Sequence, residues 1–165
     1  RLDRVWWLLS PGNPLKDHSE LGSLGNRIAH ARAVSDHPEI EVTGFEASLP
    51  SPFTADTIRE IQKRLPRVDF VWIMGADNLS NFHRWHRWRE ILRLIPVAVA
   101  DRPGWRHRAL ASAAARAFGR VRLDSERAAL LPRLAPPAWV LIDIRLSSLS
   151  STEIRRRGPV NWRRG

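Results

Sequence analysis

Short apolar runs alternate with amphipathic stretches along most of the chain. Five runs are predicted to be strands because their side chains are continuously apolar or alternate with polar ones: residues 5–9, 40–45, 68–74, 97–100 and 139–144. Apolar residues at helical spacing predict helices over residues 21–34, 54–65, 109–118 and, more weakly, 125–131, with others ending at residue 94 and starting near residue 151. Such alternation is typical of a doubly wound, mostly parallel α/β sheet, and we expect the run 68–74 to be buried on both faces.

The composition fits one globular domain spanning residues 1–165. Hydrophobic residues make up 43%, and the sequence has no internal repeat or low-complexity linker. The lack of cysteine excludes a disulfide scaffold, a zinc ribbon and a thiol nucleophile. The longest apolar run, residues 94–100, is too short for a membrane span and no signal peptide is visible, so we expect a cytoplasmic protein.

Positive charge is the most unusual feature of the composition. Lysine and arginine number 27 against 17 acidic residues, a net charge of +10, and only two of the 27 are lysines. The arginine excess indicates either phosphate recognition or the codon usage of a GC-rich genome.

Chemistry is expected in the loops that follow the strands, because ligands of such sheets bind beyond the carboxyl ends of the strands. After the first strand, Asn13 and Lys16 suit a phosphate, although the motif taken alone favours a turn with a solvated lysine. After the third, Gly75 allows a ligand close to the backbone and Asp77 can accept from ribose hydroxyls; the alternative is an ordinary turn. After the fourth, Arg102 beside a Pro-Gly turn suits a phosphate.

Two helix starts are also candidate anion sites. Thr54 is predicted to cap a helix whose first backbone N–H groups are free for a carboxylate or phosphate, or to be a plain cap. Near the end of the chain, Ser150 and Glu153 fit a capping box. The same start carries Ser151, Thr152 and Arg155, which a capping box does not require and which could hold a polyphosphate.

A basic and aromatic segment covers residues 81–89. Trp85 and Trp88 lie three apart, so one helical face could present both, with Trp85 free to stack a heteroaromatic ring and Trp88 packed on the sheet. His83 and His86 could ligate a metal, but no third ligand is in view. The segment also permits an RNA-binding interpretation, in which bases stack on tryptophan and phosphates pair with arginine.

In order and spacing, the motifs resemble those of the bacterial nicotinate-nucleotide adenylyltransferases. The resemblance runs from residue 4 to about 158, and its most specific parts are the Gly-Ala-Asp-Asn-Leu block at 75–79 with Trp85, and the Ser-Ser-Thr-Glu-Ile-Arg run at 150–155. It implies a Rossmann-like nucleotidyltransferase fold. It also implies transfer of the adenylyl group of ATP to nicotinate mononucleotide, with Mg²⁺, to give deamido-NAD and pyrophosphate.

The resemblance assigns the candidate residues to two substrates. ATP would be held by one group: Gly75 and Asp77 at the adenosine, and Ser150, Ser151, Thr152 and Arg155 at the phosphates. Nicotinate mononucleotide would be held by another: Trp85 on the pyridine ring, backbone N–H groups near Thr54 and His86 at its carboxylate, and Arg102, Asn13 and Lys16 at its phosphate. His86 stands where such enzymes commonly carry a tyrosine, which bears on selection of the acid.

One motif of the resembled family is not found in the sequence. Its members begin with a strand, a glycine-rich turn and a His-x-Gly-His motif whose histidines stabilise the α-phosphate, whereas residues 83–86 read His-Arg-Trp-His. We therefore expect the first strand–loop–helix to be absent from this chain, its neighbours in the sheet to be left unpaired, and activity and folding to be impaired.

Two alternatives remain open on the sequence. One is a basic Trp/Arg-rich RNA-binding module without enzymatic activity, although the arginines are spread from Arg1 to Arg164. The other keeps the fold and changes the acceptor to nicotinamide mononucleotide or phosphopantetheine. Phosphopantetheine has no pyridine ring for Trp85 to stack, which disfavours it.

Overall fold

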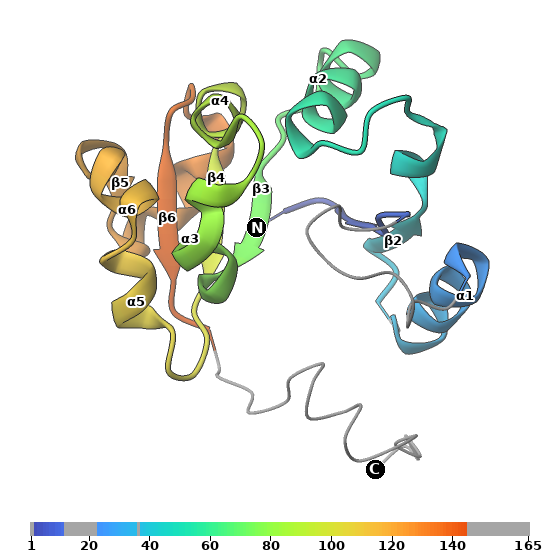
Figure 1. Cartoon of the computed structure of the whole chain (residues 1–165), viewed down its shortest axis with the longest axis horizontal. Coiled ribbons are helices and arrows are strands. Elements are labelled where there is room, and N and C mark those ends of the chain that lie inside the picture. The colour runs from blue at the N-terminus through green and yellow to red at the C-terminus, as the bar shows by residue number, and fades with distance from the viewer. Residues whose placement is uncertain (1, 12–22, 36, 145–165) are drawn as a thin grey trace.

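The strands form two parallel sheets in the computed structural model, which describes residues 2–11, 23–35 and 37–144. The smaller sheet pairs β1 (Val5–Leu8) with β2 (Ile40–Thr43). The larger has the order β3-β4-β6-β5, with β3 (Trp72–Gly75), β4 (Val97–Ala100), β5 (Arg122–Leu123) and β6 (Trp139–Ile142). All the pairings are parallel, so the predicted parallel α/β class is confirmed (Figure 1).

Helices connect successive strands. The α-helices are α1 (Leu24–Val34), α2 (Thr54–Arg64), α3 (Ala76–Asn81), α4 (Trp88–Leu94), α5 (Arg106–Leu110) and α6 (Ala113–Ala117). The 3₁₀ turns are η1 (Phe45–Ser48), η2 (Phe82–Arg84), η3 (Gly119–Val121) and η4 (Ser125–Arg133). Figure 1 shows α1 and β2 apart from the four-stranded sheet, with α3, α5 and α6 in front of that sheet.

Two predicted helices differ from the observed ones. The alanine-rich stretch 109–118 is divided between α5 and α6, because the hydroxyl of Ser112 accepts from the Ala115 amide and starts a new helix there. The stretch 125–131 forms the 3₁₀ helix η4, which contains Pro132. The helix predicted from about Ser151 lies outside the described residues.

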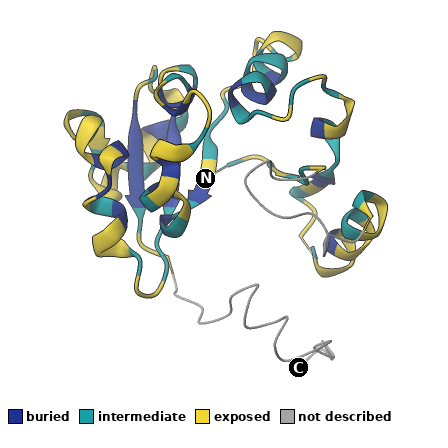
Figure 2. Ribbon diagram, viewed as in Figure 1, coloured by how far each residue is buried: buried dark blue, intermediate teal, exposed yellow. Residues whose placement is uncertain are grey.

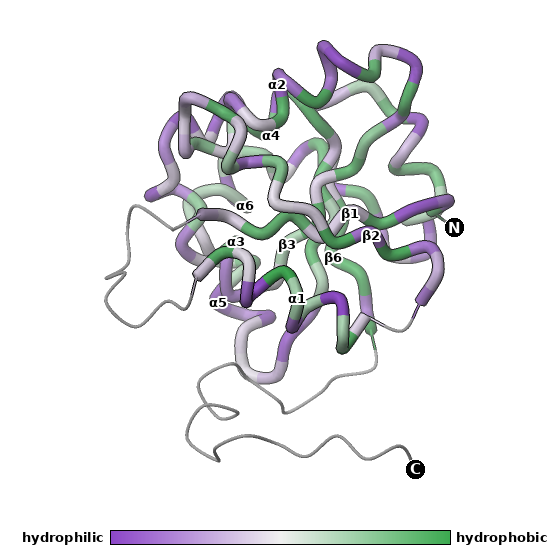
Figure 3. Tube along the Cα trace, turned by 90° about the vertical axis from the view of Figure 1, so that its right-hand side faces the viewer, coloured by the Kyte–Doolittle hydropathy of each residue, from purple (hydrophilic) through white to green (hydrophobic). Residues whose placement is uncertain are grey.

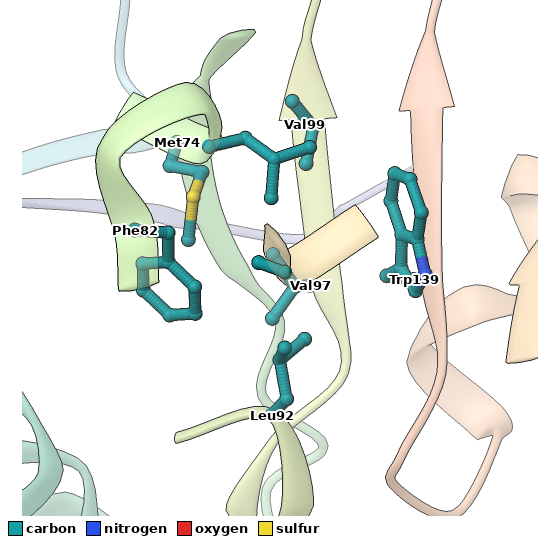
Figure 4. A pocket seen from close by; sticks show the side chains of 8 residues that line it. Met74, Phe82, Leu92, Val97, Val99 and Trp139 are labelled. Atoms are coloured by element: carbon teal, nitrogen blue, oxygen red, sulfur yellow. The ribbon is translucent and has the colours of Figure 1, made fainter. Parts of the chain in front are cut away.

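The main core lies between the four-stranded sheet and the helices on its face. Phe82, Ile91, Val97 and Val99 are completely buried there, and Figure 2 shows the continuous burial of β4 and β6. Figure 4 shows part of this core, where Met74, Phe82 and Trp139 belong to a lining that leaves no room for a water molecule. In Figure 3, β6 is mainly hydrophobic and α5 mainly hydrophilic, as expected for a central strand and a surface helix.

The strand β3 is less buried than its sequence suggests. It begins only at Trp72, and Ile73 is 44% exposed, so the prediction of a strand over 68–74 buried on both faces was wrong. The physical reason is its position: among the described residues β3 pairs only with β4, and β1 only with β2. Each therefore presents an open edge, and the ring of Trp6 on β1 lies 6.0 Å from that of Phe70, just before β3.

Candidate active site

The carboxyl ends of β3 and β4 bring together two of the predicted site residues. Gly75 and Ala100 are register partners at the ends of these strands, so the segments that follow them begin side by side. Asp77 lies in the first turn of α3, and Arg102 follows β4. An Arg102 Nη1 nitrogen donates to Asp77 Oδ2 at 2.6 Å, with both side chains half-buried. This edge is where a doubly wound sheet binds its ligand.

Gly75 lies close to the side chain of Asp77. A Cβ atom on Gly75 would lie 2.4 Å from Asp77 Oδ1, which is closer than real Cβ contacts allow. The backbone of Gly75 is extended, with φ −79° and ψ 158°, so the constraint is space and not a left-handed conformation. Sequence reasoning expected a glycine that admits a ligand; the structure shows one that admits the Asp77 carboxylate.

The loop after β4 is tied to the end of β6. The Arg102 amide donates to Asp101 Oδ1 at 2.7 Å, and the turn closes through Gly104 at φ 77°. The Arg106 guanidinium donates to Asp101 Oδ2 at 2.7 Å and also to Asp143. These hydrogen bonds, the one to Asp143 above all, raise the pKa of Arg106. Sequence reasoning missed Arg106 and Asp143; the signal available was Asp143 at the carboxyl end of a strand.

The segment that carries Trp85 does not form one helix with Trp88. Trp85 is extended after η2, and Arg87 takes a left-handed conformation before α4 starts at Trp88. The expectation that one helical face presents both tryptophans was therefore wrong. Trp88 is buried, as expected, with its ring 6.3 Å from Phe82. Trp85 is half-buried and tilted against Phe82 at 5.2 Å.

The start of α2, where Thr54 lies, is close to His86. The rings of Phe53 and His86 stack at 4.1 Å and 29°, so the loop before α2 lies against the segment after Trp85. Phe53 is the N-cap residue of α2 and Thr54 its first helical residue, so the predicted capping role of Thr54 was wrong. No side chain caps this helix. Its first backbone N–H groups therefore remain oriented toward the loop, as at any helix N-terminus.

An ion-pair network joins α2 to the start of α4. Asp56 Oδ1 accepts from Arg59 at 2.6 Å and from Arg87 at 3.4 Å. Arg87 Nε pairs with Glu90 Oε2 at 2.7 Å, and Arg59 also pairs with Glu90. The Ser51 hydroxyl donates to Asp56 Oδ2 at 2.6 Å. That hydrogen bond first, and then the charges of Arg59, Arg87 and His86, lower the pKa of Asp56 against the opposing effect of desolvation.

The lowered pKa of Asp56 predicts a pH-dependent contribution to stability. Because the carboxylate is preferred in the folded state, its contribution is fully present above its ordinary value of 3.8 and is lost as the pH falls below it. We expect Asp56→Asn to reduce the free energy of unfolding near neutral pH, and the difference from wild type to shrink below about pH 4. Urea unfolding across this range measures the difference; a pH-independent gap would contradict the prediction.

Several predicted residues lie outside the described part of the chain: Asn13, Lys16, Ser150, Ser151, Thr152 and Arg155. The loop that leads to Asn13 is described to Pro11, and the Arg27 guanidinium donates to the carbonyls of Ser10 and Pro11 at 2.8 and 3.1 Å. Among the described residues, no helix is long and apolar enough to cross a membrane.

The protein is of the parallel α/β class, and its Asp–Arg pair lies at the carboxyl ends of adjacent strands, the edge at which such sheets bind nucleotides. The sequence profile of the cytidylyltransferase-like family matches residues 1–157, nearly the whole chain. The chain belongs to this family, and three relatives place it among the nicotinate-nucleotide adenylyltransferases.

A probable nicotinate-nucleotide adenylyltransferase of Methylorubrum extorquens is 52% identical over 157 residues, covering 95% of this chain and 85% of the relative. A second, from Cereibacter sphaeroides, is 51% identical over 162 residues, covering 98% and 84%. A third, from Agrobacterium fabrum, is 49% identical over 154 residues, covering 93% and 82%.

Solved structures agree on the fold. The nicotinic acid mononucleotide adenylyltransferase of Plasmodium falciparum complexed with NaAD superposes with a TM-score of 0.66 at 15% identity, covering 94% of this chain and 69% of that one. The same enzyme complexed with APC gives a TM-score of 0.63 at 14% identity, covering 94% and 68%. At this identity the likeness concerns the fold alone.

Proposed function

We propose that the chain transfers the adenylyl group of ATP to nicotinate mononucleotide, forming deamido-NAD and pyrophosphate in NAD biosynthesis. The observation that carries the proposal is the 52% identity to a nicotinate-nucleotide adenylyltransferase over 157 residues. The geometry supports it, because Asp77 and Arg102 meet where a doubly wound sheet binds nucleotides.

The reaction requires the two substrates to be positioned and does not require a nucleophile from the protein. An oxygen of the mononucleotide phosphate attacks the α-phosphorus of ATP, and the bond from that phosphorus to the pyrophosphate oxygen breaks. Both substrates are anionic, so the protein lowers the barrier by aligning them and neutralising charge. Arginines and helix N-termini are suited to this task.

The Asp77–Arg102 pair supports a site in which the two substrates lie next to each other. We assign Asp77, together with the adjacent Gly75, to the adenosine of ATP. We assign Arg102 to the phosphate of the mononucleotide. Their contact at 2.6 Å means that groups bound by each lie within reach of one another. On sequence position, we assign Ser150, Ser151, Thr152 and Arg155 to the ATP phosphates, and Asn13 and Lys16 to the mononucleotide phosphate.

The nicotinate ring is assigned to the half-buried face of Trp85. The stacked rings of Phe53 and His86 bring the start of α2 to the same locality, so backbone N–H groups near Thr54 and His86 can bind the ring carboxylate. A carboxylate can accept from these donors through two oxygens and gains more from them as an anion than a neutral amide does, which favours the acid over nicotinamide mononucleotide.

Magnesium is proposed to enter with ATP. Within residues 2–11, 23–35 and 37–144, no group of three or more His, Cys, Asp and Glu side chains is placed to hold a metal ion. Asp77 and Asp101 each accept from an arginine. Mg²⁺ keeps several water ligands and is commonly held through substrate phosphates, so the chemistry of this edge fits MgATP better than a carboxylate cage. When bound, the ion neutralises phosphate charge.

Deamido-NAD formation by the purified protein tests the proposal. MgATP is supplied with nicotinate mononucleotide, with nicotinamide mononucleotide or with phosphopantetheine, and the dinucleotide and pyrophosphate are measured. We expect the highest kcat/KM with nicotinate mononucleotide. Faster transfer to either other acceptor would overturn the proposed acceptor. Thermal stabilisation by none of these substrates, together with binding of generic RNA, would overturn the proposed class of activity.

Trp85→Ala tests the proposed stacking surface. Loss of an aromatic stacking partner is worth roughly 0.5–1.5 kcal/mol beyond area, so we expect the KM for nicotinate mononucleotide to rise about tenfold. The KM for ATP is expected to change little. Phe118→Ala is the comparison, because Phe118 is also an aromatic residue partly buried against the core but lies after α6, in no segment assigned to a substrate. Equal changes in the two KM values for Trp85→Ala would contradict the assignment.

A further inference from the structure

The backbone reverses at Arg87, directly after the two residues assigned to the nicotinate ring. Arg87 has φ 55° and ψ 34°, and among the described residues it alone combines a positive φ with a side chain. A non-glycine residue in this conformation carries a free-energy cost, which surrounding contacts must offset. The position of Trp85 and His86 relative to α4 depends on this reversal.

The Arg87 side chain is held from both sides of the reversal. Glu90 binds it within α4 at 2.7 Å, and Asp56 binds it from α2 at 3.4 Å. Arg59 closes a four-residue ring by pairing with Asp56 and with Glu90. Two cations and two carboxylates therefore alternate around the ring, so every charge has neighbours of opposite sign. We call these residues the Asp56 network: Asp56, Arg59, Arg87 and Glu90.

Asp56 is also connected to the loop before α2, which lies on the other side of the proposed nicotinate site from Trp85 and His86. Its Oδ2 atom accepts from the Ser51 hydroxyl at 2.6 Å, and Ser51 Oγ in turn accepts from the Phe53 amide at 3.4 Å. The Phe53 ring stacks on His86. One carboxylate thus fixes both the loop before α2 and the reversal after His86, which are the two segments that face the proposed ring carboxylate.

Packing between α2 and α4 does not depend on Asp56 alone. The Gln62 side-chain amide donates to the Leu94 carbonyl at 2.8 Å, at the far end of both helices. Ile58 of α2 and Ile91 of α4 are both fully buried in the main core. Removal of the Asp56 carboxylate should therefore leave the helices docked, while the segment 84–87 loses its restraint from α2 and keeps only the one from Glu90.

From this geometry we propose that Asp56 is a positioning residue for the nicotinate site, acting through Arg87 and Ser51 to set the spacing between the start of α2 and the Trp85–His86 segment. The inference rests on the proposed function, because it assigns nicotinate mononucleotide to this locality. It predicts that loss of the network weakens binding of the mononucleotide and leaves binding of ATP intact.

Asp56→Asn is the direct test, with Glu60→Gln as its control. Glu60 lies on the same helix and, among the described residues, forms an ion pair only with the exposed Arg64, at 3.6 Å, so its neutralisation removes the same charge without touching the network. The interactions of a half-exposed network are modest, so we expect Asp56→Asn to raise the KM for nicotinate mononucleotide roughly fivefold. The KM for ATP and kcat should remain near the wild-type values, and Glu60→Gln should leave all three unchanged.

A glycine variant separates positioning from general stability. Arg87→Ala loses the ion pairs and keeps the unfavourable backbone conformation, whereas Arg87→Gly loses the same pairs and tolerates that conformation. We expect Arg87→Gly to have the lower KM for the mononucleotide of the two. Equal KM values for these variants, or an unchanged KM in Asp56→Asn, would overturn the proposal.

Hydrogen exchange provides a readout that does not depend on turnover. We expect the amides of residues 84–88 to exchange faster in Asp56→Asn than in wild type, with those of β4 unchanged. Unchanged exchange at 84–88 would overturn the positioning role even in an active enzyme. Wild-type protein that forms no deamido-NAD but shows the faster exchange in the variant would overturn the proposed function and leave the restraint on Arg87 standing.

Discussion

Replacing Gly75 by alanine is expected to lower kcat/KM for adenylyl transfer roughly 10- to 100-fold. The new methyl group would lie 2.4 Å from Asp77 Oδ1, so the carboxylate must shift, which disturbs the contact that its Oδ2 atom makes with Arg102. A hydrogen bond to a charged group is worth about 1.5–3 kcal/mol, which sets the size of the expected loss. Steady-state kinetics with varied ATP and varied mononucleotide measure it.

A double-mutant cycle tests whether the effect runs through Asp77. If the clash with Asp77 is the cause, Gly75→Ala should add little to a protein that already carries Asp77→Ala. Gly25→Ala is a matched control, since a Cβ there meets nothing within 4 Å and the residue lies in α1. That control should retain full turnover and gain roughly 0.5–1 kcal/mol of stability. Additive effects of the Gly75 and Asp77 substitutions would contradict the explanation.

Phe82→Ala is expected to produce the largest loss of folding stability, about 3–5 kcal/mol. The side chain is completely buried, and its ring lies beside both Trp85 and Trp88. Its removal leaves a cavity in a tightly packed core and withdraws the support beneath Trp85. Urea unfolding followed by circular dichroism measures the change in free energy.

Two further substitutions test whether the burial of Phe82 causes the loss of stability. Phe82→Leu keeps most of the apolar volume and should lose clearly less stability than Phe82→Ala. Val68→Ala removes an apolar side chain that is 50% exposed and should change stability by less than about 0.5 kcal/mol. A loss for Phe82→Ala no greater than that for Val68→Ala would contradict the position of Phe82 in the core.

The structure also accounts for part of the arginine excess. Arg59, Arg87, Arg102 and Arg106 form ion pairs within the protein, and the guanidinium of Arg89 lies 4.3 Å from the centre of the Trp88 ring. Their charge is therefore partly used within the fold before any substrate arrives. Codon usage and phosphate recognition were the two explanations that the composition suggested for the arginine excess. Ion pairing within the protein is a third explanation, which composition does not reveal.

Local pattern was sufficient to predict most of the secondary structure. The runs that became β1, β2, β4 and β6 were recognised because apolar periodicity reflects which side of a strand is buried. The short β5 was missed, since its two residues are too few for any periodicity. The exposure of Ile73 was also missed, because burial of a strand depends on what lies beside it and not on its own residues.

The sequence predicted which residues belong to the candidate site, but it did not predict the contacts between them. The position of Asp77 and Arg102 after successive parallel strands was enough to place both at one edge of the sheet. Neither the Phe53–His86 stack nor the role of Asp56 could be predicted, because the partners are 33 and 31 residues apart and no local rule joins them.

By itself, the sequence determined the alternating α/β order, the edge of the sheet at which chemistry gathers, and the family that these motifs resemble. These depend on properties that each short segment carries alone: side-chain periodicity, turn residues and charge. Only the tertiary structure decided that Arg102 pairs with the Asp77 carboxylate and that Arg87 reverses the chain beside Asp56. Contacts of this kind arise when packed elements bring distant side chains within a few ångströms, and packing is a property of the whole chain.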